Sequence, residues 1–454
     1  MKSLLQKKDN KDKKLAALID GEHYPEVSRD AIDLLKAYFP GSFSGIIFLG
    51  GTEKLIVSDL EKYFSEKVYI IDDIDSDFCR ALDFFKPDIA YDLSDEPVVD
   101  YKIRMKIASF CMAGKCSYMG PDFYFKWEPR YIKSQKDTVA IIGTGKRIGK
   151  TAISSYIARI LIDEGIDVAT VAMGRGGPGE PQVIKGDEVN IDEKYLLRLN
   201  ENGYHASSDY IEDALMGKVT TIGCRRCGGG FGGKIFMTNL EEGMKIAEEM
   251  DSDLLIIEGS GASMPQVDTD ITICTIGAFQ EWGSLIGYLG IYRIMMADMI
   301  ILTMCEEPIA DLKKIDHLES MIRKFNPEAA VLRTIFRPKP VSDIRGKKIF
   351  LGMTAIDSIE KNIVDHLETG YGCTVVKASF NLSRRNELKK DLENSPEFDL
   401  ILTELKAAAV DVLTEYASKD KKEVVYLDNI PIIAGSGTDL KRELIKLIKR
   451  RKNK

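Results

Sequence analysis

The sequence lacks long uncharged apolar runs and any excess of positive charge. No apolar stretch reaches the roughly 18 to 20 residues that a membrane-spanning helix needs, and residues 7–14 are charged where a secretory signal would be apolar. The formal net charge of -8 argues against a nucleic-acid-binding protein. We therefore expect a cytoplasmic protein without a membrane or nucleic-acid partner.

A disulfide framework is also missing. The eight cysteines are irregularly spaced in a chain of 454 residues, and Cys274 and Cys305 lie in apolar runs where a thiol behaves as a small hydrophobe. Reduced thiols are expected.

A glycine-rich turn between an apolar strand and a helix is the most informative feature that is present. Residues 138–151 read TVAIIGTGKRIGKT, and a helical stripe of isoleucine and leucine follows as far as Gly165. Backbone N–H groups in such a turn can approach phosphate oxygens closely, and the positive end of the helix dipole favours the same anion. Lys150 would reach the β- and γ-phosphates. We therefore predict a nucleoside-triphosphate cradle formed by Gly143, Thr144, Gly145, Arg147, Ile148, Gly149 and Thr151.

A second apolar strand ends in an acid. Residues 253–262 read DLLIIEGSGA, so Glu258 would hold Mg²⁺ opposite the Thr151 hydroxyl, directly or through water. A single carboxylate capping a buried strand is the alternative interpretation.

Three α/β segments follow one another along the chain. A chain of this length suggests about three domains on a scale of ~150 residues each, or a large two-domain enzyme. Residues 1–135 alternate strand-like and helical runs and are expected to form a separate small α/β domain, with the polar, proline-marked stretch 127–137 as linker. We assign 136–345 to a phosphate-loop (P-loop) core and 346–454 to a C-terminal α/β segment. The basic residues 441–454 are expected to form a solvated helix, with a membrane or partner contact as the alternative.

The P-loop core is expected to contain a parallel sheet. Its strand-like runs are continuously apolar rather than alternating, as in strands that are covered on both faces. These runs are 167–173, 253–257, 271–276, 298–304 and 329–335. The fold class is therefore α/β, a P-loop NTPase-like parallel sheet flanked by helices, and ligands should gather at the carboxyl ends of its strands.

Two glycine-rich segments carry cations. Arg175 lies in GRGGPGEP (174–181), where it could clamp a phosphoryl oxygen, although a surface turn is the plain alternative. Arg225, Arg226 and Lys234 lie in TIGCRRCGGGFGGK (221–234). In a flexible loop both arginines could turn to one ligand, which favours a substrate with more than one phosphate. The CxxC pair Cys224 and Cys227 leaves a zinc site, a redox switch and an anion-binding loop open.

Three further cations are candidates. Lys146 and Arg147, inside the P-loop, could neutralise charge on the transferred phosphoryl group, or could equally face solvent. Lys406 follows a strand end and is a weaker candidate for substrate binding.

The motifs resemble those of known families. GTGKRIGKT (143–151) together with EGSG (258–261) resembles the dethiobiotin-synthetase branch of P-loop proteins, in which a cation that acts on the reacting group follows the second strand, here Arg175. With the segments GRGGPGEP and CRRCGGG and the separate N-terminal domain, the whole chain resembles the cyclic 2,3-diphosphoglycerate synthetases of methanogenic archaea.

That resemblance implies an ATP-dependent, Mg²⁺-requiring ligase of archaeal type. It would form the intramolecular pyrophosphate of cyclic 2,3-diphosphoglycerate from 2,3-diphosphoglycerate and release ADP and phosphate. Lys150, Lys146, Arg175 and Glu258 are the catalytic candidates, and Arg175, Arg225, Arg226, Lys234 and Lys406 are the substrate-binding candidates. A homo-oligomer is expected. A phosphoglycerate kinase-type phosphotransferase and a nucleotide-driven metal chaperone remain as alternatives.

Overall fold

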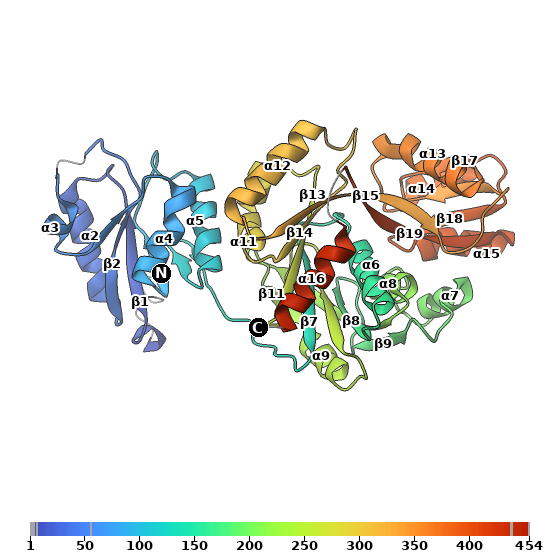
Figure 1. Ribbon diagram of the computed structural model, residues 1–454, viewed down its shortest axis with the longest axis horizontal. Coiled ribbons are helices and arrows are strands. Elements are labelled where there is room, and N and C mark those ends of the chain that lie inside the picture. The colour runs from blue at the N-terminus through green and yellow to red at the C-terminus, as the bar shows by residue number, and fades with distance from the viewer. Residues whose placement is uncertain (1–4, 6–7, 55–56, 436–438, 453–454) are drawn as a thin grey trace. The chain divides into compact units, whose positions relative to one another are not determined.

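The computed structural model describes residues 5, 8–54, 57–435 and 439–452. Part of the charged stretch 7–14 and the last two residues of the basic tail lie outside them. The chain forms two compact units, one of residues 1–130 and 281–296, the other of residues 131–280 and 297–454 (Figure 1). None of the helices in the described ranges has the length and apolarity needed to span a bilayer.

The first unit is a six-stranded sheet with strand order β3-β2-β1-β4-β5-β6, parallel except for β6. Its strands are β1 (Lys14–Ile19), β2 (Ser42–Phe48), β3 (Val68–Ile70), β4 (Ile89–Asp92), β5 (Ser117–Met119) and β6 (Tyr124–Phe125). Its helices are η1 (Lys8–Asn10), α2 (Pro25–Tyr38), α3 (Leu60–Phe64), α4 (Ile74–Phe85), α5 (Tyr101–Ala113), α10 (Trp282–Gly287) and α11 (Gly290–Met295). The last two come from the middle of the chain and pack on α5, whereas the sequence prediction had assigned their residues to the P-loop core.

The second unit is built on a 13-stranded sheet with the order β11-β10-β8-β12-β7-β13-β14-β15-β19-β18-β16-β17, and β9 pairs with β10. The strands of its P-loop half are β7 (Asp137–Gly143), β8 (Val168–Gly174), β9 (Gln182–Lys185), β10 (Thr220–Gly229), β11 (Ile235–Thr238), β12 (Leu254–Glu258), β13 (Ile271–Gly277), β14 (Met299–Thr303) and β15 (Ala330–Pro340). The strands of its C-terminal half are β16 (Lys348–Gly352), β17 (Thr374–Ser379), β18 (Leu400–Glu404) and β19 (Glu423–Ile433). The predicted α/β class with a helix-flanked, mostly parallel sheet is confirmed.

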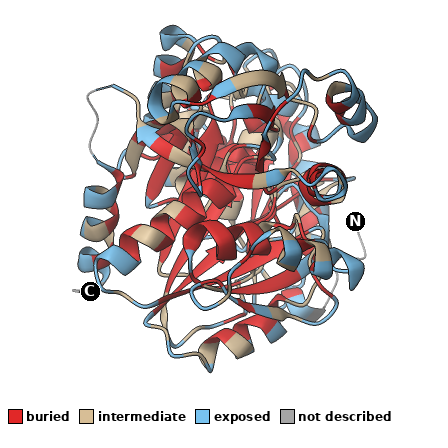
Figure 2. Ribbon diagram, turned by 90° about the vertical axis from the view of Figure 1, so that its right-hand side faces the viewer, coloured by how far each residue is buried: buried red, intermediate tan, exposed pale blue. Residues whose placement is uncertain are grey.

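Helices cover both faces of this sheet, whose strands are largely buried (Figure 2). They are α6 (Lys150–Asp163), α7 (Glu193–Glu201), α8 (Asp209–Gly217), α9 (Leu240–Glu248), α12 (Leu312–Phe325), η2 (Asp357–Ile359), α13 (Glu360–Tyr371), α14 (Arg385–Glu393), η3 (Ala409–Thr414), α15 (Glu415–Asp420) and α16 (Leu440–Lys452). Isoleucines of α6 pack against β7 and β12 in one core, and Leu240 and Met244 of α9 pack in a second core with β8, β10 and β12. The continuous apolarity of the strands reflects this double cover.

The C-terminal segment extends the central sheet. Strand β19 pairs antiparallel with β15 from Thr334↔Ile433 to Pro340↔Leu427, and β18, β16 and β17 continue in parallel beyond it. The basic terminal helix α16 is not fully solvated, because Leu440, Leu444 and Ile448 are buried in the core that contains α6.

Candidate functional site

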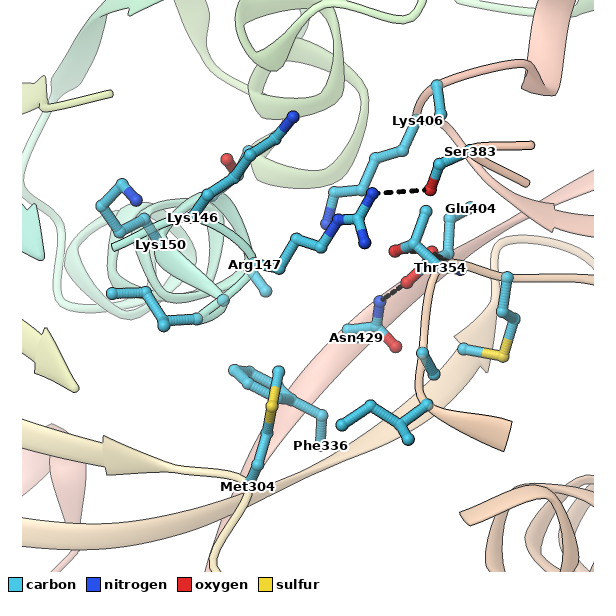
Figure 3. Close-up of a pocket in the computed structure, with 18 of the residues that line it drawn as sticks. Lys146, Arg147, Lys150, Met304, Phe336, Thr354, Ser383, Glu404, Lys406 and Asn429 are labelled. Atoms are coloured by element: carbon cyan, nitrogen blue, oxygen red, sulfur yellow. Dashed lines mark hydrogen bonds between the residues drawn. The ribbon is translucent and has the colours of Figure 1, made fainter. Parts of the chain in front are cut away.

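A cavity of about 1000 Å³ lies at the carboxyl ends of the strands, between the P-loop and the C-terminal half of the sheet (Figure 3). Its P-loop wall carries Lys146, Arg147, Ile148, Gly149, Lys150 and Thr151. Neighbouring loops of the same half add Arg175, Ser207, Ser208, Asp209, Glu258, Ser260 and Gly261. The opposite wall includes Met353, Thr354, Ile356, Phe380, Ser383, Arg384, Glu404, Lys406 and Asn429.

The P-loop turns where β7 meets α6. Gly149 is the N-cap of α6 with φ +83°, and a Cβ there would lie 2.3 Å from the Phe336 ring, so glycine is required on both counts. Lys150 Nζ donates to the carbonyl oxygen of Gly145 at 2.9 Å. Burial lowers the pKa of Lys150, and its buried cation lies inside the loop where a phosphate would be held.

Thr151 and Glu258 meet beneath the P-loop. The Thr151 hydroxyl donates to Glu258 Oε1 at 2.8 Å, and both residues are buried. Burial raises the pKa of Glu258 to about 7. Glu258 Oε2 is buried, receives no hydrogen bond from an N–H or hydroxyl group of the described residues, and lies beside the carboxyl group of Asp213. A hydroxyl next to such a carboxylate fits Mg²⁺, which binds proteins through one or two carboxylates together with water and substrate phosphates.

Helix α8 supplies carboxylates that the sequence analysis did not single out. Asp209, at its first position, lines the cavity. Asp213 lies one turn later, fully buried, where Ser155 Oγ donates to its Oδ1 at 3.0 Å. Burial and the neighbouring Glu258 raise the pKa of Asp213 well above its usual value. The signal that could have found these residues is a pair of acids at i and i+4 on a helix with many apolar positions.

Arg175 and Arg226 converge on the turn after β12. Arg226 is buried and its Nη2 donates to the Ser260 carbonyl oxygen at 2.6 Å. A Cβ placed on Gly261 would lie 3.0 Å from Arg175 Nη2 and 3.3 Å from Arg226 Nη2. Burial and the Arg175 charge lower the pKa of Arg226. Two guanidinium groups so close together favour an anion beside them, and Arg175 is the one of the two that lines the cavity.

Arg225 and Lys234 do not join this pair, which corrects the expected pair of arginines turning to one ligand. Arg225 and Arg226 lie on strand β10, not in a flexible loop, so their side chains point to opposite faces. Arg225 is exposed beside Gly179. Lys234 is exposed in the β10–β11 hairpin and does not line the cavity.

Lys406 lines the cavity but is already paired. Its Nζ lies 3.0 Å from Glu212 Oε1 on α8. Burial lowers the pKa of Lys406, but the charges of Glu212 and Glu404 outweigh this and hold it well above its usual value. Lys406 is therefore a cation whose charge is largely balanced by acids.

Lys146 and Arg147 take different positions on the P-loop. Both are exposed cavity residues. Arg147 has φ +60° and its Nη2 donates to Ser383 Oγ of the C-terminal half at 2.9 Å (Figure 3). It therefore links the two walls of the cavity.

The CxxC pair does not form a joint site. Cys224 is buried and burial raises its pKa to about 12, whereas Cys227 is exposed three positions along the same strand. Positions i and i+3 of a strand face opposite sides. Among the residues that the structure describes, no group of three or more His, Cys, Asp or Glu side chains is placed to hold a metal ion.

Comparisons with known proteins point to one family along the chain. Residues 14–126, 138–335 and 340–430 match the family models for the N-terminal, P-loop and C-terminal domains of cyclic 2,3-diphosphoglycerate synthetase. Proteins of that name from Methanothermus fervidus and Rubrobacter xylanophilus are 45% and 43% identical over 430 and 418 residues. These alignments cover 93% and 92% of this chain and 93% and 94% of the relatives. The solved structure of LpxK from Aquifex aeolicus with ATP aligns at 13% identity and a TM-score of 0.41, over 70% of this chain and 89% of its own.

Proposed function

Because this chain belongs to the cyclic 2,3-diphosphoglycerate synthetase family, we propose that it converts 2,3-diphosphoglycerate to the cyclic pyrophosphate, with ATP as phosphoryl donor and ADP and phosphate as products. The chain is an enzyme, and its P-loop domain binds a nucleotide. The observation that carries the proposal is the cavity in which Lys150, Thr151 and Glu258 lie with Arg175, next to the Ser260 turn that the buried Arg226 contacts.

The reaction needs two displacements at phosphorus. An oxygen of one substrate phosphate attacks the γ-phosphorus of ATP, and the bond to ADP breaks. An oxygen of the neighbouring substrate phosphate then attacks the inner phosphorus of the new pyrophosphoryl group, and orthophosphate leaves as the ring closes. Both steps place negative charge on oxygens near the P-loop, where fixed cations stabilise it.

Lys150 and Lys146 would stabilise the charge on the transferred phosphoryl group. Thr151 and Glu258 would hold Mg²⁺, which when bound neutralises charge on the donor's phosphates. The other P-loop residues, Gly143, Thr144, Gly145, Arg147, Ile148 and Gly149, would surround the phosphates of the nucleotide.

Arg175 and Arg226 would hold the substrate. 2,3-Diphosphoglycerate carries about five negative charges at neutral pH, and two of its phosphates must be brought into contact for ring closure. Cations beside the Gly261 turn would offset that repulsion and hold the reacting oxygens at short range. Arg225 and Lys234 would attract the substrate only weakly and from a distance. Lys406 would contribute little free charge to substrate binding, because it is paired with Glu212.

ADP release, measured with and without 2,3-diphosphoglycerate, tests the proposal when phosphorus NMR identifies the product. A cyclic pyrophosphate formed in step with ADP is expected. Lys150→Ala should lower turnover at least about a thousandfold, because the removed cation acts on the reacting phosphates. Lys245→Ala is the matched control, since Lys245 is an exposed lysine on α9 paired with Glu241. Near-normal turnover by Lys150→Ala would contradict the role of this cradle.

The same assay separates the alternatives, neither of which the comparisons support. A phosphoglycerate kinase-type enzyme would give an open phosphate ester and no cyclic product. A metal chaperone would hydrolyse nucleotide slowly without responding to 2,3-diphosphoglycerate, and would lose bound metal on Cys224→Ser. We further propose that the enzyme is cytoplasmic and forms a homo-oligomer. Sedimentation of the purified protein would test its oligomeric state, and fractionation of cells would test its location.

A further inference from the structure

The cavity has two chemically different ends. One end carries the P-loop and its cations. The other end has an apolar surface formed by Met304, Ile309, Phe336, Met353 and Phe380, beside the polar side chains of the C-terminal half. A small polyanion gains nothing from an apolar surface, because its charged groups would lose water without gaining partners. The apolar end therefore calls for a ligand, or a part of one, that is flat and weakly polar.

The topology of the C-terminal half brings a second ligand crevice to this end. The order β17-β16-β18-β19 places β17 on one side of β16 and β18 on the other. Loops that leave two adjacent parallel strands in opposite directions open a crevice at their carboxyl ends. Residues 353–357 of the loop after β16, and Lys406 and Ala407 of the loop after β18, line the cavity at this point.

A chain of hydrogen bonds sets the polar side of the crevice. Glu404, buried at the end of β18, accepts from the Thr354 backbone N–H and the Thr354 hydroxyl, both at 2.7 Å. Its other oxygen accepts from Asn429 Nδ2 at 2.6 Å (Figure 3). Both oxygens of Glu404 therefore accept hydrogen bonds from the protein itself. Glu404 thus fixes the positions of Thr354 and Asn429.

Asn429 is left with hydrogen-bonding capacity that faces the cavity. It lies opposite Pro338 in the β15–β19 ladder and lines the cavity together with Phe336. Its side chain makes no other hydrogen bond within the described residues. One N–H and the carbonyl oxygen of the carboxamide thus remain for a ligand. Phe336 contacts Gly149, so this position adjoins the phosphate cradle.

We propose that the nucleobase of the triphosphate donor binds at this apolar end, packed against Phe336 and Met304, and that Asn429 recognises its polar edge. Glu404 is the positioning residue that orients Asn429. A carboxamide that offers a donor beside an acceptor matches the adjacent acceptor and donor of adenine. The proposal rests on the proposed function only in requiring a nucleotide donor.

Calorimetric titration with a non-hydrolysable ATP analogue and with inorganic tripolyphosphate tests the proposal. Tripolyphosphate carries the phosphate chain without a base. Asn429→Ala should weaken binding of the analogue about tenfold, as expected for the loss of hydrogen bonds to a base, and leave tripolyphosphate affinity within about twofold. Asn394→Ala is the matched control, because Asn394 is exposed and, within the described chain, its side chain donates only to the Lys390 carbonyl oxygen of α14.

Asn429→Ala also removes a hydrogen bond to Glu404 and could therefore disturb folding. A second variant that leaves Glu404 and Asn429 intact separates this effect from loss of base binding. Met304 lines the cavity and is only partly buried, so the substitution Met304→Ala should fold and still weaken binding of the analogue without affecting tripolyphosphate. Wild-type affinity for the analogue in both variants would overturn the base site. If the wild-type protein bound tripolyphosphate but no ATP analogue, the choice of ATP as donor in the proposed function would fail instead.

Discussion

Arg225 and Arg226 show how a difference of one position decides what a side chain can do. The strand directs Arg226 toward Ser260 and Arg175 and leaves Arg225 in solvent beside Gly179. A buried guanidinium interacts strongly with an anion because little water screens it, whereas an exposed one interacts weakly.

Substituting the two arginines separately should give unequal effects. Arg226→Ala should raise the KM for 2,3-diphosphoglycerate about 10- to 100-fold, the usual range for losing a charge-assisted hydrogen bond. Arg225→Ala should change it by less than about twofold. Steady-state kinetics with each substrate varied in turn would measure both. Equal effects of the two changes, or an Arg226→Ala effect confined to the KM for ATP, would contradict the assignment.

The Glu258 carboxyl should make Mg²⁺ binding depend on pH. Burial raises its pKa to about 7, so the protonated acid prevails below pH 7 and the carboxylate, which a metal requires, prevails above it. Mg²⁺ affinity should therefore weaken about tenfold for each pH unit below 7 and level off above it.

Titrations of Mg²⁺-dependent nucleotide binding between pH 6 and 8 would show this trend. Glu258→Gln should bind Mg²⁺ weakly, because a neutral amide is a poorer ligand than a carboxylate. Its Mg²⁺ affinity should not change with pH, because the amide does not titrate. A wild-type affinity that stays constant across this range would exclude Glu258 as the titrating ligand.

At the scale of elements, the sequence predicted what local pattern determines. The P-loop, the apolar strands and the acid after β12 follow from short-range rules of glycine placement and hydrophobicity. Strand β10 could not be found in this way, because CRRCGG is poor in strand-forming residues and is held extended by pairing with β8 and β11. Asp209 and Asn429 were missed since tertiary packing alone brings α8 and β19 to the P-loop.

Helix α16 is an element whose environment the sequence left open. Leu444 is fully buried against the core that includes α6, whereas Leu447 is only partly buried. Leu444→Ala should lower the free energy of unfolding by about 2 to 5 kcal/mol, through lost burial and the cavity that remains. Leu447→Ala should cost clearly less, and urea denaturation of both variants would compare them. Similar losses in the two variants would show that α16 does not pack on this face.

At the scale of the whole molecule, the two compact units are not two consecutive stretches of chain. Helices α10 and α11 leave the region between β13 and β14 and pack on α5 of the first unit. Leu285, Ile286, Ile291 and Ile294 of these helices are buried. The first unit therefore depends on residues far from it in the sequence.

A fragment of residues 1–130 should accordingly be incomplete. Its thermal unfolding temperature should be lower than that of the same fragment carrying residues 281–296 on a flexible linker, because the appended helices cover apolar surface of α5. Circular dichroism of the two fragments would measure the difference. A scrambled order of the appended residues is the control, and an unchanged unfolding temperature with the native order would contradict the expectation.

The hydrogen-bonded ladder of β15 and β19 has a kinetic consequence. It makes both walls of the cavity part of one continuous sheet. We therefore expect no large hinge motion between the two walls. The Arg147–Ser383 hydrogen bond also joins the two walls, so we expect these side chains to separate before the product leaves. The rate of product release would then depend on side-chain movement rather than on the opening of a domain hinge.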